Sequence, residues 1–394
     1  MDPDNRAAGQ LGAGSGRPAA GLHVSCVLHR GRPGQPDHGR RGGHPAAGHH
    51  LVGPVRSLPE PAGTWQSALS AVSCASRTNC TAVGDFSHAR GQSALAETGR
   101  PGSWSASRPA RPCGVDSTVL SGVSCPATGF CAAVGYTLTG NTDYQPLAET
   151  RTPAGWRIVP SPGSGLMSGV SCASASFCVA VGDGIESWDG TAWHVAATLP
   201  AGRELAAVSC ASASYCLAVG PVAAGQAQPP AEAWNGSAWS AVTSTAMGLG
   251  LVSVSCPVAG WCMAAGASAD QEHPRARTWN GTGWTTVTTP DPSPGDVNGS
   301  SFTAVSCASR TACSAAGNVH FTIAEAEGPP DDAHPLAENS AGTKFGAAAS
   351  LPVPVRTLGT PLAGIWCTAT RVCVAAGTTN RIDGSVPAME SLGG

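Results

Sequence analysis

A pair of cysteines separated by five residues occurs seven times along this chain of 394 residues, and no other feature constrains the fold as strongly. The third copy reads Val-Ser-Cys-Ala-Ser-Ala-Ser-Phe-Cys-Val-Ala-Val-Gly over residues 170–182, and a glycine ends every copy. The first cysteines follow one another at intervals of 38 to 60 residues, which is typical of a repeat architecture. We number the repeats one to seven by their pairs, which are Cys74 and Cys80, Cys125 and Cys131, Cys172 and Cys178, Cys210 and Cys216, Cys256 and Cys262, Cys307 and Cys313, and Cys367 and Cys373.

Each repeat has a second half with its own pattern. Ala-Glu or a near equivalent follows the glycine in six repeats, and Arg277 stands at this place in repeat five. In repeats three to five, Trp-Asp-Gly or Trp-Asn-Gly then precedes a second tryptophan, as in residues 188–193. Asp-Gly and Asn-Gly between strand-like residues indicate a β-hairpin, because a type I′ turn requires positive φ at both central positions. Each repeat therefore predicts four short strands.

Four-stranded antiparallel sheets repeated every 40 to 50 residues or so are typical of a β-propeller. We predict an all-β fold in which seven four-stranded blades form a closed ring. The sequence stops after the third strand of repeat seven, and residues 51–59 resemble a fourth strand. The N-terminal strand is therefore expected to complete the last blade. An open solenoid or two packed sheets is the alternative.

Two roles fit the cysteine pairs. A zinc site needs four ligands, yet each repeat has one pair and no histidine recurs at a fixed offset. Cysteines that face each other across a hairpin lie within bridging distance, so we expect seven disulfides, with reduced core cysteines as the alternative. Disulfides persist in oxidising compartments, which predicts a secreted or cell-surface protein. Cys113 lies outside the seven pairs, and Cys26 is the only other cysteine that could pair with it.

The composition and charge of the chain argue against long helices, nucleic-acid binding and a membrane span. With 51 Gly, 32 Pro and 12% charged residues, the chain is poorly suited to long helices. A net charge of −3 gives no electrostatic basis for binding nucleic acid, and no stretch approaches the roughly 20 apolar residues of a membrane span. Residues 1–48 contain no aromatic Phe, Tyr or Trp, so we expect a disordered tail there and the propeller in residues 49–394. The first residues do not read as a signal peptide, and a mis-assigned start would account for this.

The motif Leu-Ser-x-Val-Ser-Cys-x5-Cys-x-Ala-Val-Gly, followed by Ala-Glu-x-Trp-Asn-Gly-x-x-Trp, resembles exported repeat proteins of high-GC Gram-positive bacteria over about residues 50–394. Those proteins are mostly uncharacterised, so the resemblance implies a propeller fold and export but no activity. Kelch, YVTN-type and sialidase-like propellers are similar more distantly. Residues 187–193 resemble the sialidase Asp-box but are one residue short, and sialidase chemistry is not carried over.

The candidate binding residues come from the loops between the second and third strands. In a propeller these loops share one face with the connections between blades, and here they vary in length and polarity. Variable loops on a rigid scaffold usually carry binding. The candidates are Asp85, His88, Asp143, Tyr144, Asp270, Glu272, His273, Asp331, Asp332, His334, Arg381 and Asp383.

No catalytic residue, metal site or cofactor is predicted. The recurrent glutamates are expected to be architectural, because catalysis needs a unique constellation, and the many serines are interpreted as turn and strand residues. Most of the 11 tryptophans occupy fixed repeat positions and are expected to pack within and between blades. We call the hairpins between the third and fourth strands, as in residues 188–193, the tryptophan hairpins. Trp65 and Trp261 lie outside them and are expected to be exposed.

The sequence therefore predicts an exported, non-enzymatic monomer that binds an extracellular protein or glycan through its variable loops. One alternative is a hydrolase or lyase of extracellular polysaccharide with acidic residues at the mouth of the central channel. The other is a structural scaffold of the cell envelope.

Overall fold

The structure is a computed structural model, and it describes residues 56–58, 60–89, 91–222, 230–242, 249–292, 297–321, 332–341, 344–346, 349–350, 360–368, 373–381 and 384–392. All regular secondary structure within these ranges consists of β-strands. The predicted tail, Cys26 and residues 51–55 lie outside the described residues. None of the described segments forms a helix long and apolar enough to cross a membrane.

The described strands form six sheets, and four of these sheets consist of one repeat each, with the strands in chain order. Their strands are β6 (Ser117–Ala127), β7 (Phe130–Thr139), β8 (Asp143–Thr152) and β9 (Gly155–Ile158) in repeat two; β10 (Met167–Ser174), β11 (Phe177–Gly182), β12 (Gly184–Trp188) and β13 (Trp193–Thr198) in repeat three; β14 (Ala207–Ser212), β15 (Tyr215–Val219), β16 (Ala231–Trp234) and β17 (Trp239–Ala241) in repeat four; and β18 (Leu249–Val258), β19 (Trp261–Ser268), β20 (Pro274–Trp279) and β21 (Trp284–Val287) in repeat five.

The other two sheets are larger. Repeat six adds a fifth strand, which pairs with its third. Repeats seven and one share a single eight-stranded sheet. The strands are β22 (Val297–Ser309), β23 (Ala312–Phe321), β24 (Asp332–Ala341), β25 (Lys344–Phe345) and β26 (Ala349–Ser350) in repeat six; β27 (Leu362–Cys367), β28 (Cys373–Arg381) and β29 (Gly384–Leu392) in repeat seven; and β1 (Arg56–Ser57), β2 (Gln66–Ser76), β3 (Asn79–His88), β4 (Gly91–Arg100) and β5 (Ser103–Ser107) at the start of the chain.

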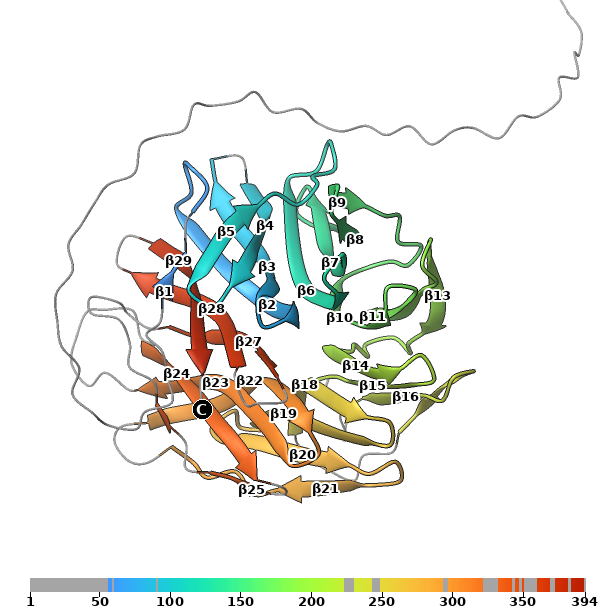
Figure 1. Ribbon diagram of the computed structural model, residues 1–394, viewed down its shortest axis with the longest axis vertical. Helices are drawn as coiled ribbons and strands as arrows, with labels where there is room; N and C mark the ends of the chain where they lie inside the picture. The colour runs from blue at the N-terminus through green and yellow to red at the C-terminus, as the bar shows by residue number, and fades with distance from the viewer. Residues whose placement is uncertain are drawn as a thin grey trace, which may run out of the picture.

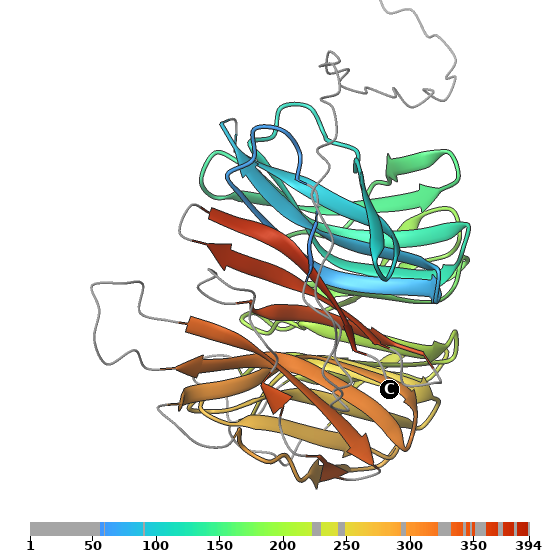
Figure 2. The same ribbon diagram turned by 60° about the vertical axis from the view of Figure 1, so that its left-hand side comes forward.

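The sheets are arranged radially (Figure 1). The first strand of each repeat lies innermost, and it packs against the first strand of the next repeat. The strands β27 and β2, from the two ends of the described chain, also pack against each other. Figure 2 shows repeats six, seven and one, in orange, red and blue, as successive layers. Four-stranded antiparallel sheets in this arrangement are the blades of a β-propeller.

The N-terminal strand pairs with the C-terminal one, as predicted. In β1, Arg56 lies opposite Met389 of β29, and Ser57 lies opposite Ala388. Leu58 extends this pairing, because its amide donates to the Pro387 carbonyl at 3.0 Å. On its other side β29 meets β2 through a single parallel bridge between Gln66 and Ser385.

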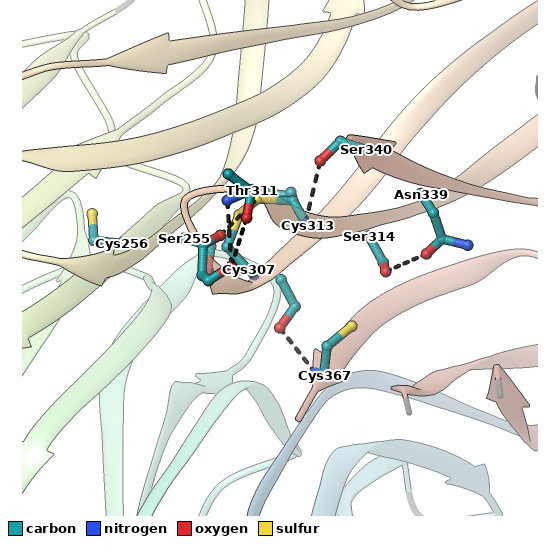
Figure 3. Close-up of a disulfide and its surroundings, with 12 residues drawn as sticks. Ser255, Cys256, Cys307, Thr311, Cys313, Ser314, Asn339, Ser340 and Cys367 are labelled. Carbon is teal, nitrogen blue, oxygen red and sulfur yellow. Dashed lines mark hydrogen bonds between the residues drawn. A yellow bond between two sulfur atoms is a disulfide. The ribbon is translucent and has the colours of Figure 1, made fainter. Parts of the chain in front are cut away.

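The seven predicted disulfides are confirmed, and each one closes the hairpin of the first two strands of its repeat. The paired Cα atoms are 3.9 to 4.1 Å apart, because the cysteines face each other across neighbouring strands. Figure 3 shows the Cys307–Cys313 bridge beside Ser255 of the preceding repeat. Cys113 is not free either, and the described part of the chain contains no free cysteine.

The tryptophan hairpins form as predicted, but their turns are not of type I′. In repeat three Trp188 lies opposite Trp193, which leaves a loop of four residues. Gly190 has a φ of +100°, whereas Asp189 has no positive φ. The Asp189 carboxylate instead accepts hydrogen bonds from the amides of Thr191 and Ala192 at 2.7 and 2.9 Å. The hydrogen bonds of the Asp189 side chain therefore stabilise a turn in which Asp189 does not adopt the positive φ that a type I′ turn requires.

The glycine that ends each repeat motif allows two backbones to approach closely. A Cβ atom added at Gly84 would lie 2.0 Å from the Ala68 carbonyl oxygen, and one added at Gly182 would lie 1.9 Å from that of Leu166. In six repeats the register shifts just after the first-strand residue opposite this glycine, as between Leu69 and Ala71 in repeat one. The glycine therefore recurs because the first-strand backbone, just before a bulge, occupies the space that a side chain would need.

Apolar residues on both faces of each sheet form the core between neighbouring repeats. In one cluster, Val83 and Ala96 of repeat one pack with Leu120 and Leu147 of repeat two. The tryptophan hairpins contribute as expected: Trp188 and Trp193 are buried in the cluster between repeats two and three. Trp65 is exposed as predicted, but the prediction for Trp261 was wrong. It is half-buried against the cluster between repeats five and six, because it begins β19 rather than lying in a free turn.

Candidate functional site

The two ends of the sheets differ in character. At the disulfide end, short turns carry the cysteine bridges and the four-residue tryptophan loops. At the variable-loop end, the second and third strands continue past the closing glycine by different lengths. β3 and β7 continue to His88 and Thr139, whereas β11 of repeat three stops at Gly182 itself. The hairpins of repeats one and two therefore extend further than that of repeat three.

Asp85 lies at the base of the extended hairpin of repeat one and is partly buried. Alternation along β3 places it on the same face as Val83, which packs against repeat two. The Gln92 side-chain amide donates to the Asp85 carboxylate at 3.2 Å. Burial raises the pKa of Asp85 to about 6, so its charge changes close to neutral pH.

Two tyrosines lie on the hairpin of repeat two. The rings of Tyr136 and Tyr144 meet edge to face, with centroids 5.5 Å apart. Tyr144 is 41% exposed, which is unusual for a large aromatic side chain held in a strand. Burial raises the pKa of Tyr136, and the nearby charge of Asp85 and the neighbouring Tyr144 raise it further. Asp85 and Tyr144, both predicted binding residues, therefore belong to the same region.

Other polar groups complete this region. The Gln145 side-chain amide donates to the exposed Asp143 carboxylate at 2.7 Å. His88 Nε2 lies 2.8 Å from the Ser93 hydroxyl, which also accepts from Arg111 at 2.9 Å. The Trp65 amide donates to the Ser87 carbonyl at 3.2 Å, which places this exposed tryptophan at the same end of repeat one.

The hairpin of repeat five brings a second group of predicted residues together. Oxygen or nitrogen atoms of Asp270, Glu272 and His273 lie within 4.8 Å of one another. His273 Nδ1 is 3.0 Å from Asp291, whose carboxylate also lies 3.6 Å from Arg275. Hydrogen bonds from Ser268 and the Glu272 amide lower the pKa of Asp270, so it carries a negative charge. This group has the donor types of a cation site, although its acidic residues are exposed.

The predicted residues do not form one site. The strands β3 and β7 lie across the ring from β19 and β20 (Figure 1). In repeat six, His334 is half-buried opposite Val319, and Asp332 pairs with Phe321 at the start of β24. Arg381 ends β28 opposite Gly384 in repeat seven. Asp331 and Asp383 lie outside the described residues.

Four of the recurrent glutamates, Glu97, Glu149, Glu186 and Glu338, are buried, as an architectural role requires. Glu149 Oε2 accepts from the Ala110 amide at 2.8 Å, and Glu186 Oε1 accepts from the Gly163 amide at 2.8 Å and the Ser161 hydroxyl at 2.7 Å. All three donors lie in the connection that enters the repeat, so the glutamate fixes that connection to the third strand. Burial raises the pKa of Glu149 to about 8.

Two other glutamates find no such donor. Within the described part of the chain, neither carboxylate oxygen of Glu97 or Glu338 has a hydrogen-bond partner, and burial raises their pKa values to about 7 and about 8. Asp291, in the connection before repeat six, raises the pKa of Glu338 further by its charge. Prolines are frequent in these connections, for example Pro290 and Pro292, and proline offers no amide hydrogen.

Tyr136, Gln92 and Gln145 contribute to the candidate site but were not among the predicted residues. The signal for Tyr136 was its position directly after the closing glycine Gly135, where repeat one has Asp85 after Gly84. The two glutamines carried no signal beyond their place in a variable loop. Their role depends on strand register, which the sequence alone did not provide.

Known protein structures share this architecture. The structure of U3-55K aligns with a TM-score of 0.56 at 8% identity, covering 86% of this chain and 98% of that one. The RRP9 WD40 repeats align with a TM-score of 0.56 at 7% identity, covering 86% and 97%. The GH74 xyloglucanase of Xanthomonas campestris aligns with a TM-score of 0.55 at 14% identity, covering 84% of this chain and 54% of that one.

These similarities define the class: the protein has a β-propeller fold. The identities are too low to show more than the fold. No protein-family model matches the sequence, and no curated protein sequence matches it.

Proposed function

We propose that this protein is a closed seven-bladed propeller, formed by residues 49–394, that is exported and binds an extracellular glycan or protein at its variable-loop end. Seven disulfide-closed hairpins and the contact between β27 and β2 support the seven-membered ring. The pairing of β1 with β29 supports closure by the N-terminal strand. The disulfides support export, because such bridges persist in oxidising compartments.

One observation carries the binding function. The variable-loop end of repeats one and two carries the exposed aromatic residues Trp65 and Tyr144, and the carboxylates Asp85 and Asp143 lie at the same end. At the disulfide end, in contrast, the turn groups bond among themselves, as Asp189 does with the amides of its own loop. Exposed aromatic groups with polar neighbours are common in binding surfaces.

The test immobilises the intact protein and measures capture of purified cell-wall polysaccharide and of secreted proteins. The binding variant combines Trp65→Ala with Asp143→Lys, and the matched control is Arg310→Glu, an exposed residue of the disulfide end. We expect capture by wild type and the control and at least a tenfold loss in the binding variant. Capture that is absent, or that depends only on Arg310, would contradict the proposal. Light scattering on the same samples tests the proposed monomer.

A second candidate function is that of a polysaccharide hydrolase or lyase. Asp85 favours it, because a carboxyl group whose pKa is near 6 suits general acid catalysis. Release of reducing ends from neutral polysaccharides, compared between wild type and Asp85→Asn, tests this candidate. An equal rate in the two proteins would exclude Asp85 as the catalytic acid.

A further inference from the structure

The hairpin of repeat two has two faces with different surroundings. Alternation along β7 places Tyr136 on the same face as Ala132 and Val134, which pack against Met167 and Ala180 of repeat three. The opposite face carries Ala133, which packs against repeat one. Tyr136 and Tyr144 therefore face repeat three.

Repeat three is too short to cover that face. Its second strand ends at the closing glycine Gly182, and Asp183 alone joins it to the third strand, which begins at Gly184. The hairpin of repeat two continues to Thr139 and returns at Asp143, well past this level. The part of the hairpin beyond repeat three is thus uncovered, which explains why Tyr144 is 41% exposed.

The uncovered face is ordered rather than loose. Tyr136 is half-buried and its ring meets that of Tyr144 edge to face, so the partly exposed Tyr144 ring is supported by a neighbouring ring. Tyr144 also stands opposite Leu138 in the strand register, and Pro146 stands opposite Tyr136. We call the surface formed by Tyr136, Leu138, Tyr144 and Pro146 the tyrosine shelf.

The surroundings of the tyrosine shelf are polar and acidic. The exposed Asp183 lies at the variable-loop end of the neighbouring repeat, where its carboxylate accepts from the Leu166 amide at 2.8 Å. Asp85 lies on the other side of the repeat two hairpin, between repeats one and two, and is still close enough to influence Tyr136 electrostatically. Two phenol hydroxyls and nearby carboxylates accept hydrogen bonds from hydroxyl groups, and an aromatic face packs against the C–H face of a pyranose ring. The same carboxylates repel an anionic ligand.

We propose that the tyrosine shelf is a subsite for a neutral oligosaccharide, with one sugar ring stacked on Tyr144. This inference rests on the proposed binding function and specifies its ligand. A supported aromatic ring of this size matches one sugar unit, and the disulfide-closed repeat holds it in place before binding. Little side-chain order is then lost when the ligand binds.

The test measures binding of neutral gluco-, xylo- and manno-hexasaccharides to the full chain by saturation-transfer NMR and titration calorimetry, with oligogalacturonate as the anionic comparison. We expect at least one neutral oligosaccharide to bind and oligogalacturonate not to bind. Tyr144→Ala should weaken binding at least tenfold, whereas Tyr144→Phe, which keeps the ring, should stay within about threefold. Val195→Ala, which alters an exposed residue on the outer strand of repeat three, should have no effect.

The outcomes separate this inference from the proposed function. If no neutral oligosaccharide binds, or if binding is unchanged in Tyr144→Ala, the subsite is refuted. If the Trp65 and Asp143 variant still abolishes capture of a protein in that case, binding at the variable-loop end stands and its ligand is a protein. If capture also fails, both proposals fall. Melting temperatures of the variants check that each protein is folded.

Discussion

The Ser255 hydroxyl accepts a hydrogen bond from the Cys307 amide at 2.9 Å, so a serine of repeat five is tied to the first cysteine of repeat six (Figure 3). The same bond recurs at 2.9 to 3.0 Å between every consecutive pair of repeats from one to seven, with serines 73, 124, 171, 209 and 306 as the other acceptors. The serine before each first cysteine is thus an inter-repeat tie. Repeat seven has Trp366 at this place, and Trp366 packs into the cluster shared with repeat one instead.

Removing one of these ties tests their contribution. Ser255→Ala leaves the Cys307 amide without its acceptor between packed strands, so we expect a loss of about 1 to 2 kcal/mol in the free energy of unfolding. Ser105→Ala, on the exposed outer strand of repeat one, is the matched control and should change stability by less than about 0.5 kcal/mol. Urea unfolding measures both. Equal effects in the two variants would show that the inter-repeat bond adds nothing.

The disulfides predict both a chemical and a thermodynamic result. Thiol titration of the native protein should find fewer than about two reactive thiols per chain, because the described cysteines are bonded. The double variant Cys172→Ala and Cys178→Ala should lose about 2 kcal/mol of stability, the value expected for closing so short a loop. Thermal unfolding with and without reductant provides the comparison, since reduction should destabilise wild type far more than one double variant does. A wild-type melting temperature that reductant leaves unchanged would contradict this role.

The closing glycines predict a sharp contrast between two alanine substitutions. Gly182→Ala puts a Cβ atom 1.9 Å from a backbone carbonyl oxygen, so we expect a loss of about 3 kcal/mol or more, or failure to fold. Gly129→Ala, in the disulfide turn of repeat two, meets no atom within 4 Å and has no positive φ, so it should be near neutral. Circular dichroism and expression yield suffice to compare them. A folded, stable Gly182→Ala protein would mean that the bulge relaxes freely.

Much of the fold could be predicted because its determinants are local and repeated. The cysteine spacing requires a hairpin, and the Asp-Gly and Asn-Gly turns mark another, so strand order follows within each repeat. The turn type was not predictable, because the Asp189 side chain competes with the type I′ conformation through hydrogen bonds that appear only in the folded loop. Trp261 was misplaced for a similar reason, since its burial depends on the neighbouring repeat.

The candidate site was predictable only in part. The variable loops were the correct region in which to find Asp85 and Tyr144, but the pattern of the loops did not show which face of a hairpin stays uncovered. That depends on the strand register of repeat two and on the early end of repeat three at Gly182. The Ser255–Cys307 tie was also missed, because it joins residues 52 positions apart whose side-chain and backbone groups look unremarkable in sequence.

The buried glutamates predict that stability falls as the pH rises. Glu149 has a pKa of about 8 in the folded protein, whereas an exposed glutamate in the unfolded chain titrates near 4.3. Between these values the folded state holds a proton that the unfolded state has released, so the stabilisation is complete below about pH 4 and is lost progressively as the pH rises towards 8.

Glu149→Gln keeps an oxygen acceptor for the Ala110 amide but cannot ionise. Its free energy of unfolding should therefore decline less than that of wild type between pH 5 and pH 8, by up to about 3.5 kcal/mol. Urea unfolding at pH 5, 6.5 and 8 measures the two slopes, with Glu272→Gln, at the exposed tip of the repeat five hairpin, as the control that should follow wild type. Parallel pH dependences in wild type and Glu149→Gln would show that Glu149 is already ionised in the folded protein at neutral pH, and the connection from repeat one would then be held by a charged carboxylate.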